Sequence, residues 1–178
     1  VMITPSDGGG DIFAGPSSPD TSNPFGGLWF VSKPWGVPEF GLSPSMNPPP
    51  AGWTYEGWYM RPDGTFLSTG RFSDVLKVDD RAPYKNADPS LNVDSLLSLW
   101  TFPGEDFLQN APMGWTFPLD VHTPGSMAFV TLEPEPDLSP APFLHLTAYC
   151  KELTPAMVSN VQYPLDTPPL PSGVAVLK

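Results

Sequence analysis

The residues best suited to metal or acid–base chemistry in this chain are its carboxylates. The segment EPEPD (133–137) repeats acidic residues between prolines, and Asp79, Asp80 and Asp88 are spread through a polar stretch. Carboxylate oxygens are the ligands that calcium prefers, but neither group has the spacing of an EF-hand loop or of a glycine-rich calcium repeat. We therefore interpret EPEPD as a solvated strand exit and expect no cofactor, with Asp79, Asp80 and Asp88 as the calcium candidates.

The remaining group that could act as a nucleophile is a single thiol. Cys150 is the only cysteine, so the chain can form no internal disulfide, and the two histidines, His122 and His145, bring no catalytic motif with them. The apolar run LHLTAYC around Cys150 indicates a buried, inert small hydrophobe. None of the 19 acidic residues stands in a context that marks a glycosidase acid and nucleophile. We expect that the chain is not an enzyme.

Net charge excludes one large class of partner. The 178 residues carry a formal charge of −11 with only eight basic residues, which are not clustered. A phosphate backbone would be repelled, so we expect no nucleic-acid partner. No stretch is apolar and long enough to span a bilayer, and the chain begins at Val1 without a signal-type segment. We expect an extracellular or cell-surface protein, secreted after removal of a signal peptide.

The segment from Gly52 to Phe72 predicts a β-hairpin around which the fold is organised. Its first arm alternates between two faces: one carries Trp53, Tyr55 and Tyr59, and the other carries Thr54, Glu56, Trp58 and Met60. Pro62-Asp63-Gly64 predicts the reversal of the chain. Gly57 interrupts one face, which is typical of a β-bulge or of a close approach by another group.

The aromatic residues of this first arm allow three interpretations. Trp53, Trp58 and Tyr59 form an aromatic surface in the predicted hairpin. Such a surface could stack on sugar rings, could form a subunit interface, or could simply be core. The sequence leaves all three open, and glycans are therefore among the possible partners.

Further strands are predicted along the chain, and proline separates them. The clearest are Gly27–Ser32, Ser126–Glu133, Phe143–Cys150 and a terminal strand, Gly173–Lys178. Prolines number 26, which disfavours helices and central ladders in the connections. We predict an all-β fold, an antiparallel β-sandwich with long proline-rich loops and less than about a tenth helix. Residues 1–24 are expected to be an N-terminal strand and a tether rich in Pro, Ser and Gly, and residues 25–178 a single sandwich domain.

The order of several short motifs resembles a bacterial family. GWTYEGWYM, the turn at PDG, FLSTGRF and, later, MAFVTLEPEPDLSPAP are similar to the extracytoplasmic C-terminal domain of anti-sigma-K factor (RskA-like) proteins and related bacterial surface proteins. The resemblance spans Leu28 to Leu146 and implies a β-sandwich outside the cytoplasmic membrane, in a prokaryote. The matching positions are Tyr55, Trp58, Gly64, Ser68, Gly70, Phe72, Thr131, Glu133, Pro134, Ser139, Pro140 and Pro142.

The family's regulators also carry a cytosolic helical domain that binds a sigma factor and a transmembrane helix, and this chain shows neither. The resemblance therefore does not imply sigma-factor binding by this polypeptide.

Two functions follow from these expectations. The first is a structural, self-assembling filament subunit, a head-to-tail homopolymer in which the N-terminal segment pairs with a sheet edge of its neighbour. The alternative is a detached extracytoplasmic sensory or ligand-binding module, for example one that binds carbohydrate. The residues expected to exchange between subunits in the first case are Val1, Met2, Ile3, Thr4, Ile12, Phe13, Val174 and Val176.

Overall fold

The computed structural model describes residues 10–14, 26–32, 48–73, 103–158 and 162–168. These residues form strands joined by loops, and their only helical element is a 3-10 turn, Leu144–Leu146. The all-β prediction is confirmed. No helix among the described residues has the length and apolar character needed to cross a membrane.

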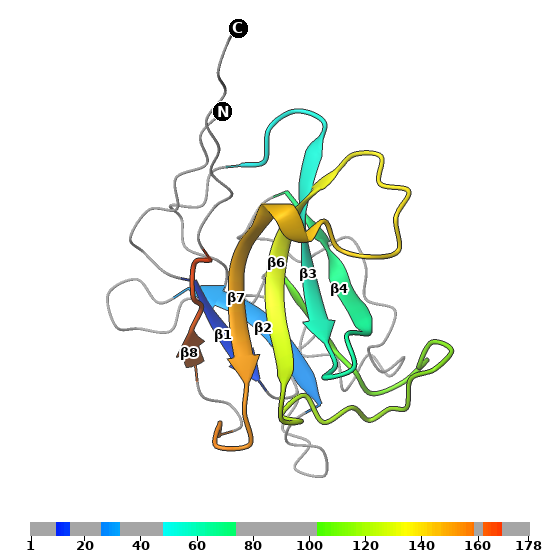
Figure 1. Cartoon of the computed structure of the whole chain (residues 1–178), viewed down its shortest axis with the longest axis vertical. Coiled ribbons are helices and arrows are strands. Elements are labelled where there is room, and N and C mark those ends of the chain that lie inside the picture. The colour runs from blue at the N-terminus through cyan, green and yellow to red at the C-terminus, as the bar shows by residue number, and fades with distance from the viewer. Residues whose placement is uncertain (1–9, 15–25, 33–47, 74–102, 159–161, 169–178) are drawn as a thin grey trace, which may run out of the picture.

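The strands form two four-stranded sheets in which every pairing is antiparallel (Figure 1). The first sheet has the order β5 (Gly104–Asp106), β2 (Gly27–Ser32), β1 (Gly10–Ala14) and β8 (Gln162–Pro164). The second has the order β4 (Phe66–Phe72), β3 (Trp53–Met60), β6 (Ser126–Pro134) and β7 (Thr147–Leu153).

The predicted hairpin is β3 and β4, and its turn lies where the sequence placed it. The backbone N–H of Gly64 donates to the carbonyl of Arg61 over 2.9 Å, and Gly64 adopts a φ of 82°, a conformation that glycine tolerates best. The strand register shifts at Gly57/Trp58, which is the expected bulge. A Cβ on Gly57 would lie 2.5 Å from the ring of Phe30, so the expected close approach is present as well.

Two other strand predictions need adjustment. β6 extends one residue beyond its prediction, to Pro134. The strand expected at Phe143–Cys150 begins only at Thr147, because the preceding residues form the 3-10 turn and the Thr147 hydroxyl donates to the carbonyl of Leu144 over 2.8 Å. The strand β5, three residues long and paired with β2, was not predicted from the sequence.

The N-terminal strand β1 lies inside the first sheet, between β2 and β8. Along β1, Ile12 pairs with Phe30 of β2 on one side and with Tyr163 of β8 on the other. Both edges of β1 are therefore occupied within the same chain, and the exchange of Ile12 and Phe13 with a neighbouring subunit stays a prediction. The remaining exchange candidates, Val1, Met2, Ile3, Thr4, Val174 and Val176, lie outside the described residues, as does the predicted strand at Gly173–Lys178.

A single buried apolar cluster joins the two sheets. Leu28 and Phe30 of β2 belong to the same cluster as Tyr59 of β3 and Val130 of β6, and each of these side chains is at most 1% exposed. The loop after β5 adds Phe107, which is fully buried, and Trp115 and Phe117 are packed against the cluster.

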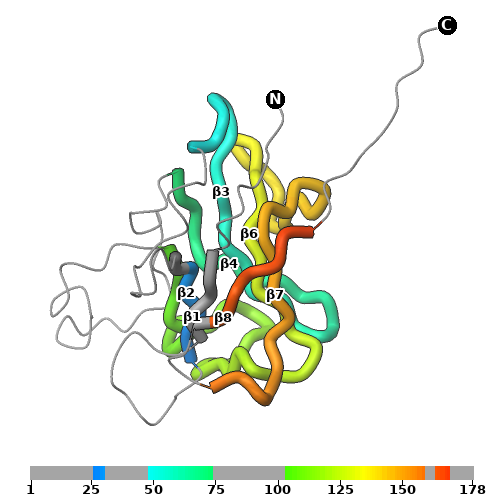
Figure 2. Tube along the Cα trace, turned by 90° about the vertical axis from the view of Figure 1, so that its left-hand side faces the viewer, coloured from blue at the N-terminus to red at the C-terminus, as the bar shows by residue number. Residues whose placement is uncertain are grey.

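The sheets are also joined along one side by the chain that follows β8. In Figure 2 this segment runs up beside β7. Asp166 and Cys150 exchange two backbone hydrogen bonds there, of 2.9 and 2.8 Å. This bridge brings the end of the described chain, including Pro168, next to the strand that carries Cys150.

Candidate functional site

The candidate site lies on the outer face of the second sheet, which we define as the face opposite the core. Successive residues of a strand point to opposite sides, so the neighbours of the core residues in β3 and β6 must face outward. These outward residues are Thr54, Glu56, Trp58 and Met60 of β3 and Met127, Phe129, Thr131 and Glu133 of β6, and none belongs to the core cluster.

One end of the outer face is an ion-pair cluster centred on Arg71 of β4. The guanidinium contacts Glu56 at 3.0 Å through Nε and Asp137 at 2.6 Å through one terminal nitrogen, and Glu135 lies 3.7 Å from the other. The side chains of Arg71, Glu56 and Asp137 are 15%, 5% and 3% exposed, so this cluster is largely removed from water. The Arg71 guanidinium therefore contacts three carboxylates, and two of them belong to the loop that follows β6.

Glu133 completes this end by fastening the loop that follows β6. Its carboxylate accepts hydrogen bonds from the Thr131 hydroxyl on the same strand and from the backbone N–H of Phe143, the latter over 2.7 Å. The loop leaves β6, swings past the ends of β3 and β4 and returns through the 3-10 turn into β7 (Figure 1). Asp137 and Glu133 thus tie this loop to the sheet at two points.

Burial is the largest influence on the pKa of Glu56 at this end of the outer face. Desolvation raises the pKa of Glu56, and the nearby Glu133 carboxylate raises it further, whereas hydrogen bonds from Ser68 and the Arg71 charge act in the opposite direction. The Ser68 hydroxyl donates to Glu56 over 2.5 Å. Glu56, Glu133 and Asp137 each accept hydrogen bonds from protein donors, and Glu133 and Asp137 thereby join the loop to the sheet.

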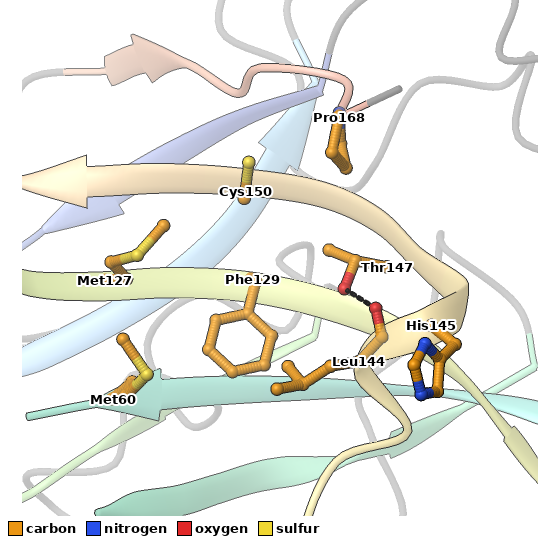
Figure 3. A pocket seen from close by; sticks show the side chains of 8 residues that line it. All are labelled: Met60, Met127, Phe129, Leu144, His145, Thr147, Cys150 and Pro168. Atoms are coloured by element: carbon orange, nitrogen blue, oxygen red, sulfur yellow. Dashed lines mark hydrogen bonds between the residues drawn. The ribbon is translucent and has the colours of Figure 1, made fainter. Parts of the chain in front are cut away.

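The other end of the outer face is an apolar pocket of about 390 Å³. Figure 3 shows its walls: strands β3, β6 and β7 form the floor, the 3-10 turn closes one side, and the segment after β8 reaches the other. The lining residues are Met60, Met127, Phe129, Leu144, His145, Thr147, Cys150 and Pro168. Their position follows from the alternation of the strands and from the Cys150–Asp166 bridge.

Two of the rings that line the pocket pack against neighbouring aromatic rings. The ring of Phe129 meets Phe66 of β4 edge to face, with ring centres 6.0 Å apart. His145 packs in the same manner against Phe143, at 5.8 Å. The apolar wall formed by Phe129 is therefore braced from β4, and the polar rim at His145 is braced from the loop.

The thiol of Cys150 is partly buried in this pocket, less enclosed than the sequence indicated. Burial raises its pKa, and the charge of Asp166 raises it further, whereas Lys151 lowers it. A raised pKa reduces the fraction of thiolate, which is the nucleophilic form. Cys150 is thus accessible in part but poorly activated for covalent chemistry.

The residues of the predicted aromatic surface, Trp53, Trp58 and Tyr59, are buried or partly buried. Trp58 is 2% exposed and donates through its indole N–H to the Thr131 hydroxyl over 2.9 Å. Tyr59 is 1% exposed, faces the core and shares a hydrogen bond of 2.8 Å with Ser126. Trp53 is partly buried against the core cluster. The sugar-stacking interpretation is therefore wrong for Trp58 and Tyr59, because both side chains are buried.

The metal expectations have two outcomes. Asp79, Asp80 and Asp88 lie outside the described residues. EPEPD is a solvated strand exit only in its middle, where Pro134, Glu135 and Pro136 are exposed, because Glu133 is 1% exposed and the Asp137 side chain pairs with Arg71. Within the described ranges, no group of three or more His, Cys, Asp or Glu side chains is arranged to hold a metal ion.

Sequence reasoning missed both ends of the outer face as sites. Glu56 pairs directly with Arg71 across the hairpin, so the predicted turn already contained the signal for that ion pair. The pocket had no local signal. Its residues come from β3, β6, the 3-10 turn, β7 and the segment after β8, and only their assembly in space makes a cavity.

Comparison with known proteins adds no family to this description: no family model, curated protein or solved structure matches the chain.

Proposed function

We propose that this chain is a non-enzymatic, extracytoplasmic β-sandwich module that binds a small apolar ligand in the pocket of the outer face. The observation that carries this proposal is the pocket itself. Its lining is dominated by Met60, Met127, Phe129 and Leu144, with His145 and Thr147 as polar groups near the 3-10 turn. A mainly apolar cavity with a few polar groups is the usual form of a small-molecule site.

The size and lining of the pocket limit the class of ligand that could bind there. A volume of about 390 Å³ is near the lower end of the range for small-molecule sites, which favours a compact ligand. The thioether side chains of Met60 and Met127 are flexible and polarizable, so they adapt to ligands of different shape. The net charge of −11 disfavours anionic ligands, and a neutral molecule is the best fit.

The proposed location rests on the sequence. The resemblance to the extracytoplasmic domain of anti-sigma-K factor proteins favours a position outside the cytoplasmic membrane. In the alternative function expected from the sequence, such a domain acts as a detached sensory module. A ligand pocket on a sheet face supports that role better than it supports a filament built by exchange of β1, whose edges are already paired.

The test is binding of a neutral fluorescent probe, N-phenyl-1-naphthylamine, to the intact chain. We expect saturable binding that Leu144→Glu weakens roughly tenfold, because the substitution places a charge in the apolar wall. Leu138→Glu is the matched control, since Leu138 is 93% exposed in the same loop and does not line the pocket. Equal probe affinity in the two variants, or no binding by the parent chain, would contradict the proposal.

Self-assembly into a structural polymer is the second candidate function, and one observation favours it. Leu138, Phe143 and Leu144 expose 93%, 42% and 51% of their surface on the loop that follows β6 and its 3-10 turn. Exposed apolar groups gathered on one loop are typical of contact surfaces. Sedimentation and electron microscopy of the intact chain would detect polymers, and Leu138→Glu should disperse them while leaving probe binding unchanged. A monomer at all concentrations would exclude this candidate.

A further inference from the structure

One side-chain hydroxyl interrupts the apolar lining of the pocket. Thr147 of β7 lines the pocket together with Phe129 of β6 and Leu144 of the 3-10 turn. Side chains of a regular strand alternate between its two faces, so Thr147 and Cys150, which are three residues apart, should lie on opposite faces of the sheet. Both nevertheless line the same pocket, so β7 must depart from regular alternation between them.

A β-bulge at Ala148 is this departure. Val130 of β6 pairs with Tyr149 of β7. The next residue of β6, Thr131, pairs with Thr147, which leaves Ala148 without an opposite residue. Tyr149 belongs to the core cluster and Ala148 packs against it, so two successive residues face inward. The bulge thereby places the Thr147 side chain on the outer face, at the pocket.

The Thr147 hydroxyl can offer a ligand an acceptor but no proton. Its Oγ1 donates to the carbonyl of Leu144 over 2.8 Å, a hydrogen bond that Figure 3 shows at the edge of the pocket. A hydroxyl has a single proton to donate and two lone pairs that accept. Because the proton is used to hold the 3-10 turn, the lone pairs are what Thr147 presents to a bound molecule.

We propose that Thr147 selects ligands with a hydrogen-bond donor, and that the ligand class is the neutral, single-ring phenols. This inference rests on the proposed function and names the class of its ligand. The phenol hydroxyl donates to Thr147 Oγ1, and the ring packs against Phe129 and toward the thioether of Met127. Aromatic rings favour edge-to-face contacts with one another and contacts with thioether sulfur.

The charge and size of a single-ring phenol also suit the pocket. A phenol has a pKa of about 10, so it is neutral at neutral pH and is not repelled by the net charge of −11. One ring with a short alkyl chain is compact enough for a cavity of about 390 Å³. An ether of the same size has only lone pairs to offer, so its binding would cover the Thr147 oxygen and leave it without a hydrogen bond from the ligand.

The test compares 4-propylphenol with 4-propylanisole, in which a methyl group replaces the hydroxyl proton. Ligand-observed NMR titrations of the intact chain measure the dissociation constant of each compound. We expect 4-propylphenol to bind about fivefold more tightly, the effect of one hydrogen bond between neutral groups.

Substitutions of threonine assign this preference to one atom. Thr147→Val keeps the shape of the side chain but removes the acceptor, so the two compounds should bind with equal affinity. Thr147→Ser keeps the hydroxyl and should retain the preference for the phenol. Thr123→Val is the matched control, because the Thr123 hydroxyl also donates to the carbonyl three residues earlier, that of Asp120, but Thr123 is exposed and does not line the pocket.

The outcomes separate this inference from the proposed function. Equal affinities of the parent chain for the two compounds would overturn the inference, and binding of N-phenyl-1-naphthylamine in the same sample would leave the apolar-ligand proposal standing. A preference that survives Thr147→Val would place the acceptor on another group, such as His145, and would also overturn it. If neither compound nor the fluorescent probe binds the parent chain, both proposals fall. If circular dichroism shows that Thr147→Val does not fold, Thr147→Ala takes its place with the same expected result.

Discussion

The two faces of the β4–β3–β6–β7 sheet are built on different principles. The inner face presents Tyr55, Tyr59, Val130 and Leu132 to one continuous core, and each of these residues is at most 3% exposed. The outer face changes character along its length, from the ion-pair cluster around Arg71 to the apolar pocket between Met60 and Pro168. The two ends of the outer face therefore have different surroundings, one polar and ion-paired and the other apolar.

The two ends of the outer face also differ from each other. The charged end is closed by its own loop through Asp137 and Glu133, and its polar atoms are engaged by that closure. The apolar end is open and has no such cover among the described residues. We infer that the charged end serves stability and that the apolar end serves binding, and the following predictions test this division.

Removing the central cation should have the largest effect. Arg71→Ala leaves Glu56 and Asp137 buried without their cation, and breaking a buried pair in this way costs about 3–5 kcal/mol. Urea unfolding would measure the loss of stability. Arg61→Ala is the matched control, because Arg61 lies 3.7 Å above the ring of Trp115 at the other side of the hairpin and its loss should cost only about 1 kcal/mol.

Equal losses for the two arginine variants would contradict a special role for the charged end. A loss in Arg71→Ala that leaves probe binding in the pocket intact would support the division between the two ends.

The inner face is tested at Gly57. A methyl group in Gly57→Ala would lie 2.3 Å from the Thr69 hydroxyl oxygen and 2.5 Å from the Phe30 ring, and such overpacking costs about 1–3 kcal/mol. Gly52→Ala is the control: its φ of 81° strains an alanine by about 1 kcal/mol, but nothing lies within 4 Å of the added atom. Urea unfolding should rank Gly57→Ala as the less stable variant, and the reverse order would contradict the close contact between the sheets.

These examples show where sequence was sufficient and where it was not. The hairpin could be predicted because its alternation and its turn are local, and the turn at Gly64 fixes which residues face each other. The ion pair that removes the Asp137 side chain from water could not be predicted, because Asp137 meets Arg71 across 66 positions of the chain. The same limit applies to β1, whose partners β2 and β8 are chosen by the assembled sheet.

Local apolar patterns were insufficient in two places. The run FLHL was read as the start of a strand, but a 3-10 turn satisfies its backbone and leaves Leu144 half exposed at the pocket. The aromatic pattern of β3 left sugar binding, a subunit interface and core all open, and Trp58 is buried with a hydrogen bond to Thr131. The pattern of residue types along one strand cannot show which polar atom of a neighbouring strand lies within hydrogen-bond distance.

A smaller effect is expected when pH is varied. Burial raises the pKa of Glu56 above its ordinary 4.5, so the folded protein binds this proton more tightly than the unfolded chain does. The stability that follows is fully present below the unfolded pKa and is lost as pH rises through the folded pKa. Glu56→Gln cannot titrate, so the stability of the parent relative to this variant should fall as pH increases from 4.5 toward neutrality.

Urea unfolding of the parent and of Glu56→Gln at a series of pH values measures this difference. Ser68→Ala removes a hydrogen bond to the Glu56 carboxylate and should make the dependence on pH steeper. A parent stability that rises over this range relative to Glu56→Gln would show that the Arg71 charge outweighs burial.

The smallest effect on stability is expected at the open end, for Cys150→Ala. The hydrogen bonds that join Cys150 to Asp166 use backbone atoms only, so the substitution keeps the bridge and removes one partly buried sulfur, at a cost of about 1 kcal/mol or less.

The reactivity of the Cys150 thiol should nevertheless report on the pocket. Because burial raises its pKa, a maleimide at neutral pH should label the native protein more slowly than the urea-unfolded chain, yet to completion, since the pocket is open. Saturating N-phenyl-1-naphthylamine should slow labelling of the native protein further and leave labelling of the unfolded chain unchanged. Labelling that is fast and insensitive to the probe would place the thiol outside the ligand site. It would contradict the inference that the apolar end of the outer face binds a ligand.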